Sequence, residues 1–141
     1  MTGTASGGSF AYDANGNMIT RVLSGTTTSL AYDAENRLIS ATVGSETTRY
    51  VYDGDGTLVA KVAGGQTTVY VGAHYEKNLT TGVVTKHYLL GGQRVAMRVD
   101  GTVTWIHANH LGSASLTTND SGAVVGEMRY YPYGQTRWTT G

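Results

Sequence analysis

The chain of 141 residues has no cysteine, a single proline and a single phenylalanine. Without cysteine it can form neither a disulfide nor a thiolate site. Ten basic and ten acidic residues give a formal net charge of zero, and charged residues make up only 14% of the chain. Such a sequence has no net field to attract nucleic acid or an anionic membrane. No apolar run approaches the roughly 18 residues of a membrane span. We therefore expect no nucleic-acid partner and no membrane insertion.

What the chain does contain is typical of β-structure. It has 20 glycines and 10 tyrosines, and hydrophobic residues make up 40% of it. Threonine and valine are also frequent. Short runs of these residues alternate between apolar and polar positions and are separated by glycine-containing pairs, which is typical of strands joined by tight turns. No segment has the period of an amphipathic helix.

One phrase occurs three times at a spacing of 20 residues, over residues 10–20, 30–40 and 50–60. In each copy an apolar run ends in a tyrosine and an aspartate, a polar turn follows, and a second apolar run begins. The motif residues are Tyr12, Asp13, Gly16, Tyr32, Asp33, Tyr52, Asp53 and Gly56. Self-similarity at a fixed short period indicates one supersecondary unit used repeatedly.

Each copy is predicted to be a β-hairpin. Asn15-Gly16 and Asp55-Gly56 are strong hairpin signals, because such turns need residues with positive φ. An aspartate that starts the turn can accept a backbone N–H two residues further on. After residue 69 the period loosens, but hairpins continue. We predict an all-β fold, a continuous antiparallel meander of stacked β-hairpins, with a flexible leader over 1–9, one β-domain over 10–137 and a tail over 138–141.

The Tyr-Asp turns resemble the YD repeats of bacterial Rhs proteins, insecticidal toxin-complex cocoon subunits and teneurins. Residues 107–134 are similar to the C-terminal end of an Rhs core. The motifs that carry this second likeness are His110-Leu111-Gly112, the turn at 119–122, and Tyr131-Pro132 with Gly134. The resemblance covers residues 10–137. It implies a spiral of hairpins that, in longer relatives, coils into a hollow shell around a toxin or a folding intermediate.

The resemblance also sets expectations for partners and location. It implies further YD or Rhs repeats of a longer chain, or copies of this chain, as partners, and a secreted or cell-surface location. Tyr131 stands where the family usually has aspartate before Pro132. The chain stops at Gly141, before the downstream elements that accompany self-cleavage in the family. We therefore expect neither autoproteolysis nor toxin activity.

Candidate chemical residues are sparse. A metal site needs three or four converging ligands, and the four histidines, His74, His87, His107 and His110, do not have that pattern. The aspartates at 13, 33, 53, 55 and 100 lack the spacing of a calcium loop. We expect no catalytic residue, cofactor or metal, and interpret the motif residues as structural.

The leading hypothesis is a non-catalytic structural segment, part of a β-shell or wall. A repeat array with uncovered ends leaves strand edges that can pair with another copy, so a self-assembling extracellular filament is the first alternative. A carbohydrate- or cell-surface-binding module that uses exposed tyrosines with Trp105 and Trp138 is the second alternative. An enzyme ranks last.

Overall fold

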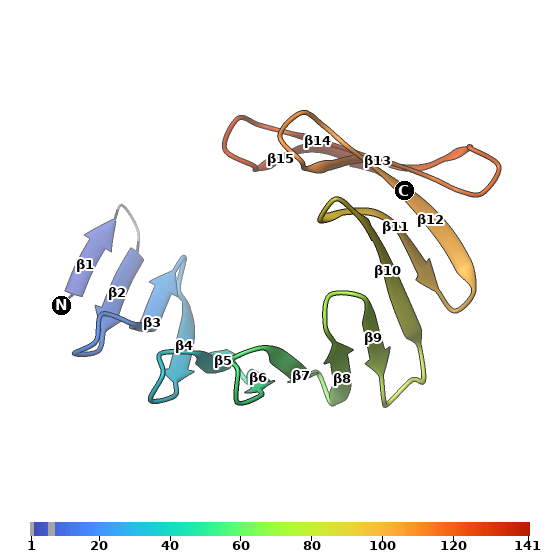
Figure 1. The fold of residues 1–141 in the computed structure, drawn as a ribbon. Coiled ribbons are helices and arrows are strands. Elements are labelled where there is room, and N and C mark those ends of the chain that lie inside the picture. Colours follow the sequence, from blue (N-terminus) through green and yellow to red (C-terminus); the bar gives the residue numbers. More distant parts are fainter. Residues whose placement is uncertain (1, 6–7) are drawn as a thin grey trace. The chain divides into compact units, whose positions relative to one another are not determined.

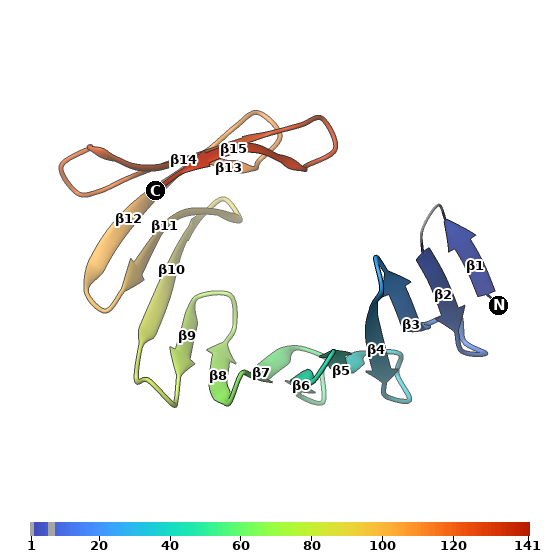
Figure 2. The same cartoon turned by 180° about the vertical axis from the view of Figure 1, so that it is seen from behind.

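A computed structural model of the chain describes residues 2–5 and 8–141. These residues form fifteen strands, which follow one another in the sheet in the order of the sequence. Figure 1 traces this succession and Figure 2 shows it from behind. The described part of the chain has no helix, and so none that could cross a membrane. The prediction of an all-β antiparallel meander is confirmed.

The chain divides into two compact units. Unit 1 comprises Met1–Tyr70 and Asn78–Thr81, and unit 2 comprises Val71–Lys77 and Gly82–Gly141. The predicted β-domain over 10–137 contains parts of both, and its limits stay a prediction. The predicted leader over 1–9 includes strand Thr2–Ala5 and the start of the next strand, while its residues 1, 6 and 7 lie outside the described residues. The predicted tail over 138–141 includes the end of the last strand.

Unit 1 holds the first eight strands, and each paired neighbour runs antiparallel. The alternation of apolar and polar residues predicted for the repeat appears as alternate exposure along the strands. The strands are β1 (Thr2–Ala5), β2 (Gly8–Tyr12), β3 (Met18–Leu23), β4 (Thr26–Tyr32), β5 (Leu38–Val43), β6 (Glu46–Tyr52), β7 (Leu58–Ala63) and β8 (Gln66–Val71).

Unit 2 holds the remaining seven strands, again with antiparallel pairing. They are β9 (Tyr75–Asn78), β10 (Val84–Leu90), β11 (Gln93–Val99), β12 (Thr102–Ala108), β13 (Ala114–Thr118), β14 (Val124–Tyr130) and β15 (Thr136–Thr140). Within each unit, the strands that contact one another are neighbours in the sequence. Each unit is thus a single layer of sheet.

A single layer has little interior. Among the described side chains only Ala96, at 1% exposure, and Thr28, at 6%, are buried. Large apolar side chains such as Ile19, Ile39 and Val51 remain exposed. Ordinary domains bury a core between two packed layers. In the described residues the apolar side chains of both sheet faces are covered only by their neighbours within the sheet.

Two kinds of connection join most of the strands, and the exceptions are residues 72–74 between β8 and β9 and residues 79–83 between β9 and β10. One kind is a two-residue turn with positive φ, as at Ser24-Gly25 and Asp100-Gly101. This is the turn that matches the natural twist of a hairpin. The other kind has five residues between the strands, and in unit 1 it begins at the aspartate of the Tyr-Asp motif. It is the candidate site.

Candidate functional site

Six connections share one backbone geometry, which we call the five-residue turn. The N–H of its first residue donates to the carbonyl of its fifth at 2.7–3.0 Å, and the N–H of its fourth donates to the carbonyl of its first at 2.9–3.2 Å. The fourth residue has positive φ, between 62° and 88°. The six turns are residues 13–17, 33–37, 53–57, 109–113, 119–123 and 131–135.

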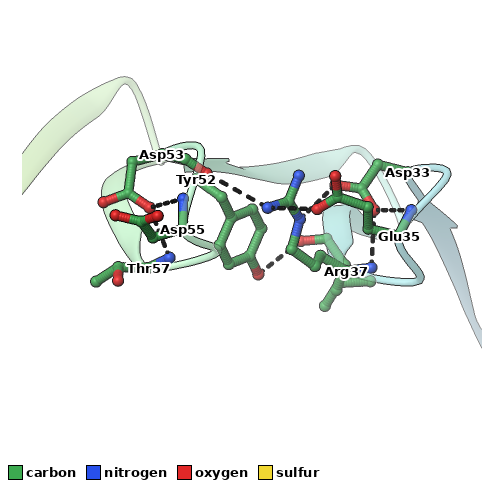
Figure 3. A network of polar contacts seen from close by, with 8 residues as sticks. Asp33, Glu35, Arg37, Tyr52, Asp53, Asp55 and Thr57 are labelled. Atoms are coloured by element: carbon green, nitrogen blue, oxygen red, sulfur yellow. Dashed lines mark hydrogen bonds and ion pairs between the residues drawn. The ribbon is translucent and has the colours of Figure 1, made fainter.

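In unit 1 an aspartate side chain closes each five-residue turn from within. Oδ1 of Asp33 accepts the N–H groups of Glu35 and Arg37, both at 2.9 Å (Figure 3). Oδ1 of Asp53 accepts the corresponding N–H groups of Asp55 and Thr57 at 3.0 and 2.8 Å. The first turn repeats the arrangement, with two N–H bonds to Asp13 at 2.8 and 2.9 Å. Two otherwise unpaired backbone donors per turn are therefore satisfied locally.

Unit 2 uses the same turn with uncharged first residues. Oδ1 of Asn109 accepts the N–H groups two and four residues on, at 2.9 and 3.0 Å. Oδ1 of Asn119 does the same, with both distances 3.0 Å. Tyr131 starts the last turn and has neither a carboxylate nor an amide to accept these bonds. The structure places His110, Leu111 and Gly112 inside the turn that begins at Asn109.

Hydrogen bonding lowers the pKa of two turn aspartates, Asp13 and Asp33. The Asn17 side-chain amide, which donates to Oδ2 at 3.0 Å, is the largest cause that lowers the pKa of Asp13 below 3.8. For Asp33 the backbone N–H of Arg37 is the largest cause that lowers the pKa, and the Arg37 side chain adds to it. The Arg37 guanidinium donates through Nε to Oδ2 of Asp33 at 2.7 Å. The same bond raises the pKa of Arg37.

The fifth residue of each of the first two turns in unit 1 links it to the next turn. Nδ2 of Asn17 donates to Oδ1 of Asn36 at 2.7 Å. Nη1 of Arg37 donates to the carbonyl of Asp53 at 3.3 Å, and its guanidinium lies over the Tyr52 ring, 5.3 Å from the centroid (Figure 3). We call this chain of contacts the turn row. Sequence reasoning singled out the tyrosines and aspartates but missed Asn17 and Arg37. Their recurring place, four residues after the aspartate, was the available signal.

The tyrosine that precedes a turn can reach back to the previous turn on the same edge. Oη of Tyr52 donates to the carbonyl of Leu38, which follows the second turn, at 3.0 Å. Oη of Tyr130 donates to the carbonyl of Ala114 at 2.7 Å, and Ala114 likewise follows a turn. A tyrosine hydroxyl therefore joins the turns at 109–113 and 131–135 in unit 2, as another joins the turns at 33–37 and 53–57 in unit 1. Tyr12 and Tyr32 sit at the same strand ends and are partly buried.

The four histidines belong to unit 2 and are not members of the turn row. Nε2 of His87 is 3.5 Å from Oε1 of Glu76, and Nε2 of His107 is 3.0 Å from Oγ1 of Thr118. The described residues contain no group of three or more histidine, aspartate or glutamate side chains that could hold a metal ion. The five-residue turns can therefore order the backbone and join neighbouring hairpins. Their aspartates already serve as acceptors of backbone N–H hydrogen bonds.

Comparison with known proteins identifies the repeat. Residues 12–45, which hold the first two five-residue turns, match the family model described as RHS Repeat. No curated protein matches the chain.

Solved structures match nearly the whole chain. The crystal structure of TcdB2-TccC3 is similar with a TM-score of 0.71 and 19% identity over 92% of this chain, and TcdB2-TccC3-Cdc42 with 0.70 and 20% over the same share. The Photorhabdus luminescens Tc holotoxin pore is similar with 0.69 and 17% over 95%. This chain spans only 8–10% of those chains. At such identities the likeness establishes the fold.

Proposed function

We propose that the chain is a non-catalytic structural segment, one stretch of an RHS-repeat wall in a larger secreted or cell-surface protein. The observation that carries the proposal is a single-layer sheet with almost no buried side chain, whose turns are nevertheless fixed in place by their own side chains. Fixed turns give each hairpin a defined shape. The uncovered faces are suited to a wall that further repeats or enclosed material would cover.

The turn row supports this role because it connects neighbours only. Each contact joins one hairpin to the next along the same sheet edge, as Arg37 does with Asp53. Repeat proteins gain their stability from such nearest-neighbour interfaces, and so they extend without a separate core. The likeness to stretches of much longer chains agrees with a segment of a longer wall.

The electrostatics of the turn acids argue against general acid–base catalysis. An acid–base catalyst works best with a pKa near the working pH. The pKa values of Asp13 and Asp33 are instead held below 3.8 by hydrogen bonds. These carboxylates stay ionised at neutral pH, and their lone pairs are used by the turn.

A filament is the second candidate, and one observation favours it. β15 ends the order of strands in the sheet, and all five of its residues are exposed. An uncovered edge strand can pair with a strand of another copy. A head-to-tail contact of this kind produces an open fibre when its rotation does not close.

Sedimentation velocity, negative-stain microscopy and binding of the dye ANS to the purified chain test both candidates. A wall segment is expected to be a monomer or an irregular small oligomer that binds ANS, because its apolar faces are open. Regular fibres that disappear in Thr139→Lys, which places a charge on the edge strand, would favour the filament. A monodisperse monomer that binds no ANS would contradict both, because such a chain covers its own apolar surface.

A further inference from the structure

Two cations of unit 2 stand directly opposite one another. Lys86 on β10 pairs in register with Arg98 on β11, and both are exposed. Side chains in such a pair lie about 5 Å apart at Cβ, and like charges there are destabilising. None of the ion pairs among the described residues includes either cation. The stability of the fold therefore does not explain why Lys86 and Arg98 lie opposite one another.

The pair lines a small cavity. The cavity holds about 260 Å³ and is bordered by Lys86, Arg98, Val84, Asp100 and Gly101. Oδ1 of Asp100 accepts the Val84 N–H at 3.0 Å, so this carboxylate is partly engaged by backbone. Lys77 pairs in register with Val84 and adds a third cation on the same face. Three cations and one carboxylate leave a local excess of positive charge in a chain of zero net charge.

Two aromatic residues lie beside the cations on this face. Tyr88 on β10 and Trp105 on β12 both pair in register with Ala96 on β11, from opposite sides. Because residues two apart on a strand share a face, Tyr88 lies next to Lys86 and Ala96 lies next to Arg98. Ala96 is only 1% exposed, whereas Tyr88 is 41% and Trp105 is 46% exposed. The two aromatic side chains thus flank a small residue, on strands about 9.5 Å apart.

We propose that this face of unit 2, defined by Lys86, Arg98, Tyr88 and Trp105, binds an acidic polysaccharide. Sugar rings present C–H groups that pack on the electron-rich faces of aromatic rings. A sugar carboxylate in the cavity would accept charge-assisted hydrogen bonds from Lys86 and Arg98, and the planar Arg98 fork matches a carboxylate in two-pronged geometry. The binding of such a ligand is separate from the wall role and does not depend on it.

The arrangement favours a polysaccharide over a nucleic acid. Nucleic acids carry a phosphate at every nucleotide, and proteins that bind them neutralise many phosphates with an extended basic surface. Here the cations are few and form one cluster, and the aromatic residues extend beyond it across neighbouring strands. One sugar carboxylate at the cluster, with the rings of neighbouring sugars on the aromatic residues, fits this division.

Polygalacturonate is the test ligand, and Trp105 is the reporter. In the variant Trp138→Phe the only remaining tryptophan is Trp105. Titration with polygalacturonate is expected to change its fluorescence, whereas neutral dextran of similar length leaves the fluorescence unchanged. Calorimetry of the unmodified chain with the same ligands gives the dissociation constants. Binding is expected to weaken as salt is raised, because exposed charges are screened.

Variants separate the charge contribution from the stacking contribution. Lys86→Gln/Arg98→Gln is expected to weaken binding about tenfold and to flatten the salt dependence. Trp105→Ala is expected to weaken binding by about tenfold while the salt dependence remains. The matched control is Arg21→Gln/Arg49→Gln, which removes the same charge from exposed strand positions of unit 1 and leaves binding unchanged. Circular dichroism of every variant verifies that the sheet is intact.

Three results would overturn the proposal. The first is no binding of polygalacturonate to the intact chain. The second is equal weakening by the Arg21/Arg49 control, which would mean that net charge alone attracts the polymer. The third is tighter binding of an oligothymidine of equal charge, which would assign the face to nucleic acid instead.

Discussion

The two units use the same five-residue turn in different ways. In unit 1 the turn occurs at every second connection, so its three copies lie on one edge of the sheet and can touch. In unit 2 three successive connections are five-residue turns, which start at residues 109, 119 and 131 and therefore alternate between the two edges. Unit 1 opens each turn with aspartate, whereas unit 2 opens with asparagine or tyrosine.

The difference explains why the sequence looks repetitive only at first. A period of 20 residues arises where a five-residue turn and a two-residue turn alternate, because the full cycle is two strands and two unlike connections. At the last three connections of unit 2, which are all five-residue turns, the 20-residue spacing is lost although the backbone geometry of the turn persists. The side chains of the five-residue turns then differ according to the sheet edge on which the turns lie. The charged row of Asp33 and Arg37 forms where turns are neighbours on one edge.

The largest expected effect tests whether the turn is really the same in both units. Gly16 and Gly112 occupy the fourth position with φ of 88° and 79°, and a Cβ there would meet nothing within 4 Å. Gly16→Ala and Gly112→Ala should therefore each lower the free energy of unfolding by about 1–2 kcal/mol, from backbone strain alone. Urea unfolding followed by circular dichroism measures the loss.

A glycine in the same kind of turn supplies the control. Gly54 has no positive φ and also has open space around it. Gly54→Ala should leave stability unchanged or raise it slightly, because alanine restricts the unfolded chain. A large loss in Gly16→Ala with none in Gly112→Ala would mean that the two units do not share a strained fourth position.

The next effect concerns the tyrosine that joins two turns on one edge. Tyr52→Phe removes the bond to the Leu38 carbonyl but keeps the ring beneath Arg37, and should cost about 1 kcal/mol of unfolding free energy. Tyr130→Phe removes the matching bond in unit 2, which is more exposed, and should cost about 0.5 kcal/mol. Thermal unfolding of both variants measures the difference. Tyr32→Phe is the control and should be neutral, and a loss there equal to that of Tyr52→Phe would rule out the hydroxyl bond as the cause.

A gain is expected where unit 2 departs from the shared pattern. Tyr131 leaves the N–H groups of Tyr133 and Gln135 without the side-chain acceptor that every other five-residue turn has. Tyr131→Asp should supply it and raise the unfolding free energy by about 0.5–1 kcal/mol. Tyr131→Asn should do nearly as well, as Asn109 does, whereas Tyr131→Ala should give no gain. Destabilisation by both Asp and Asn would show that the aromatic side chain has a packing role at this position.

The fold could be predicted from the sequence because its signals are local. Alternating strands and the Asn15-Gly16 pair indicate hairpins without any knowledge of distant residues. The equivalence of the turns at 13–17 and 109–113 was not predictable in the same way, since Asp13 and Asn109 differ while the hydrogen bonds match. The opposition of Lys86 and Arg98 depends on strand register, which is shifted by an irregularity between Tyr88 and Leu89. Such shifts leave no clear mark in the sequence.

The smallest effect, and the most selective, is the response of the two units to acid. The pKa values of Asp13 and Asp33 are lowered below 3.8 in the folded chain, so these groups add stability at pH values above 3.8. That stability is lost as the pH falls through the lowered pKa values, where protonation removes the negative charge that accepts the N–H bonds. Asn109 accepts the same bonds without titrating.

Acid should therefore loosen the turns that begin at Asp13 and Asp33 while the turn at Asn109 persists. The amide proton shifts of Asn17 and Arg37 should titrate below pH 3.8, and that of Ser113 should stay constant over the same range, as measured by two-dimensional NMR. Asp33→Asn should abolish the titration at Arg37 and leave the titration at Asn17, because each aspartate closes its own turn. A common midpoint at Ser113 and Asn17 would instead indicate global acid unfolding, and the two kinds of turn would then not be electrostatically distinct.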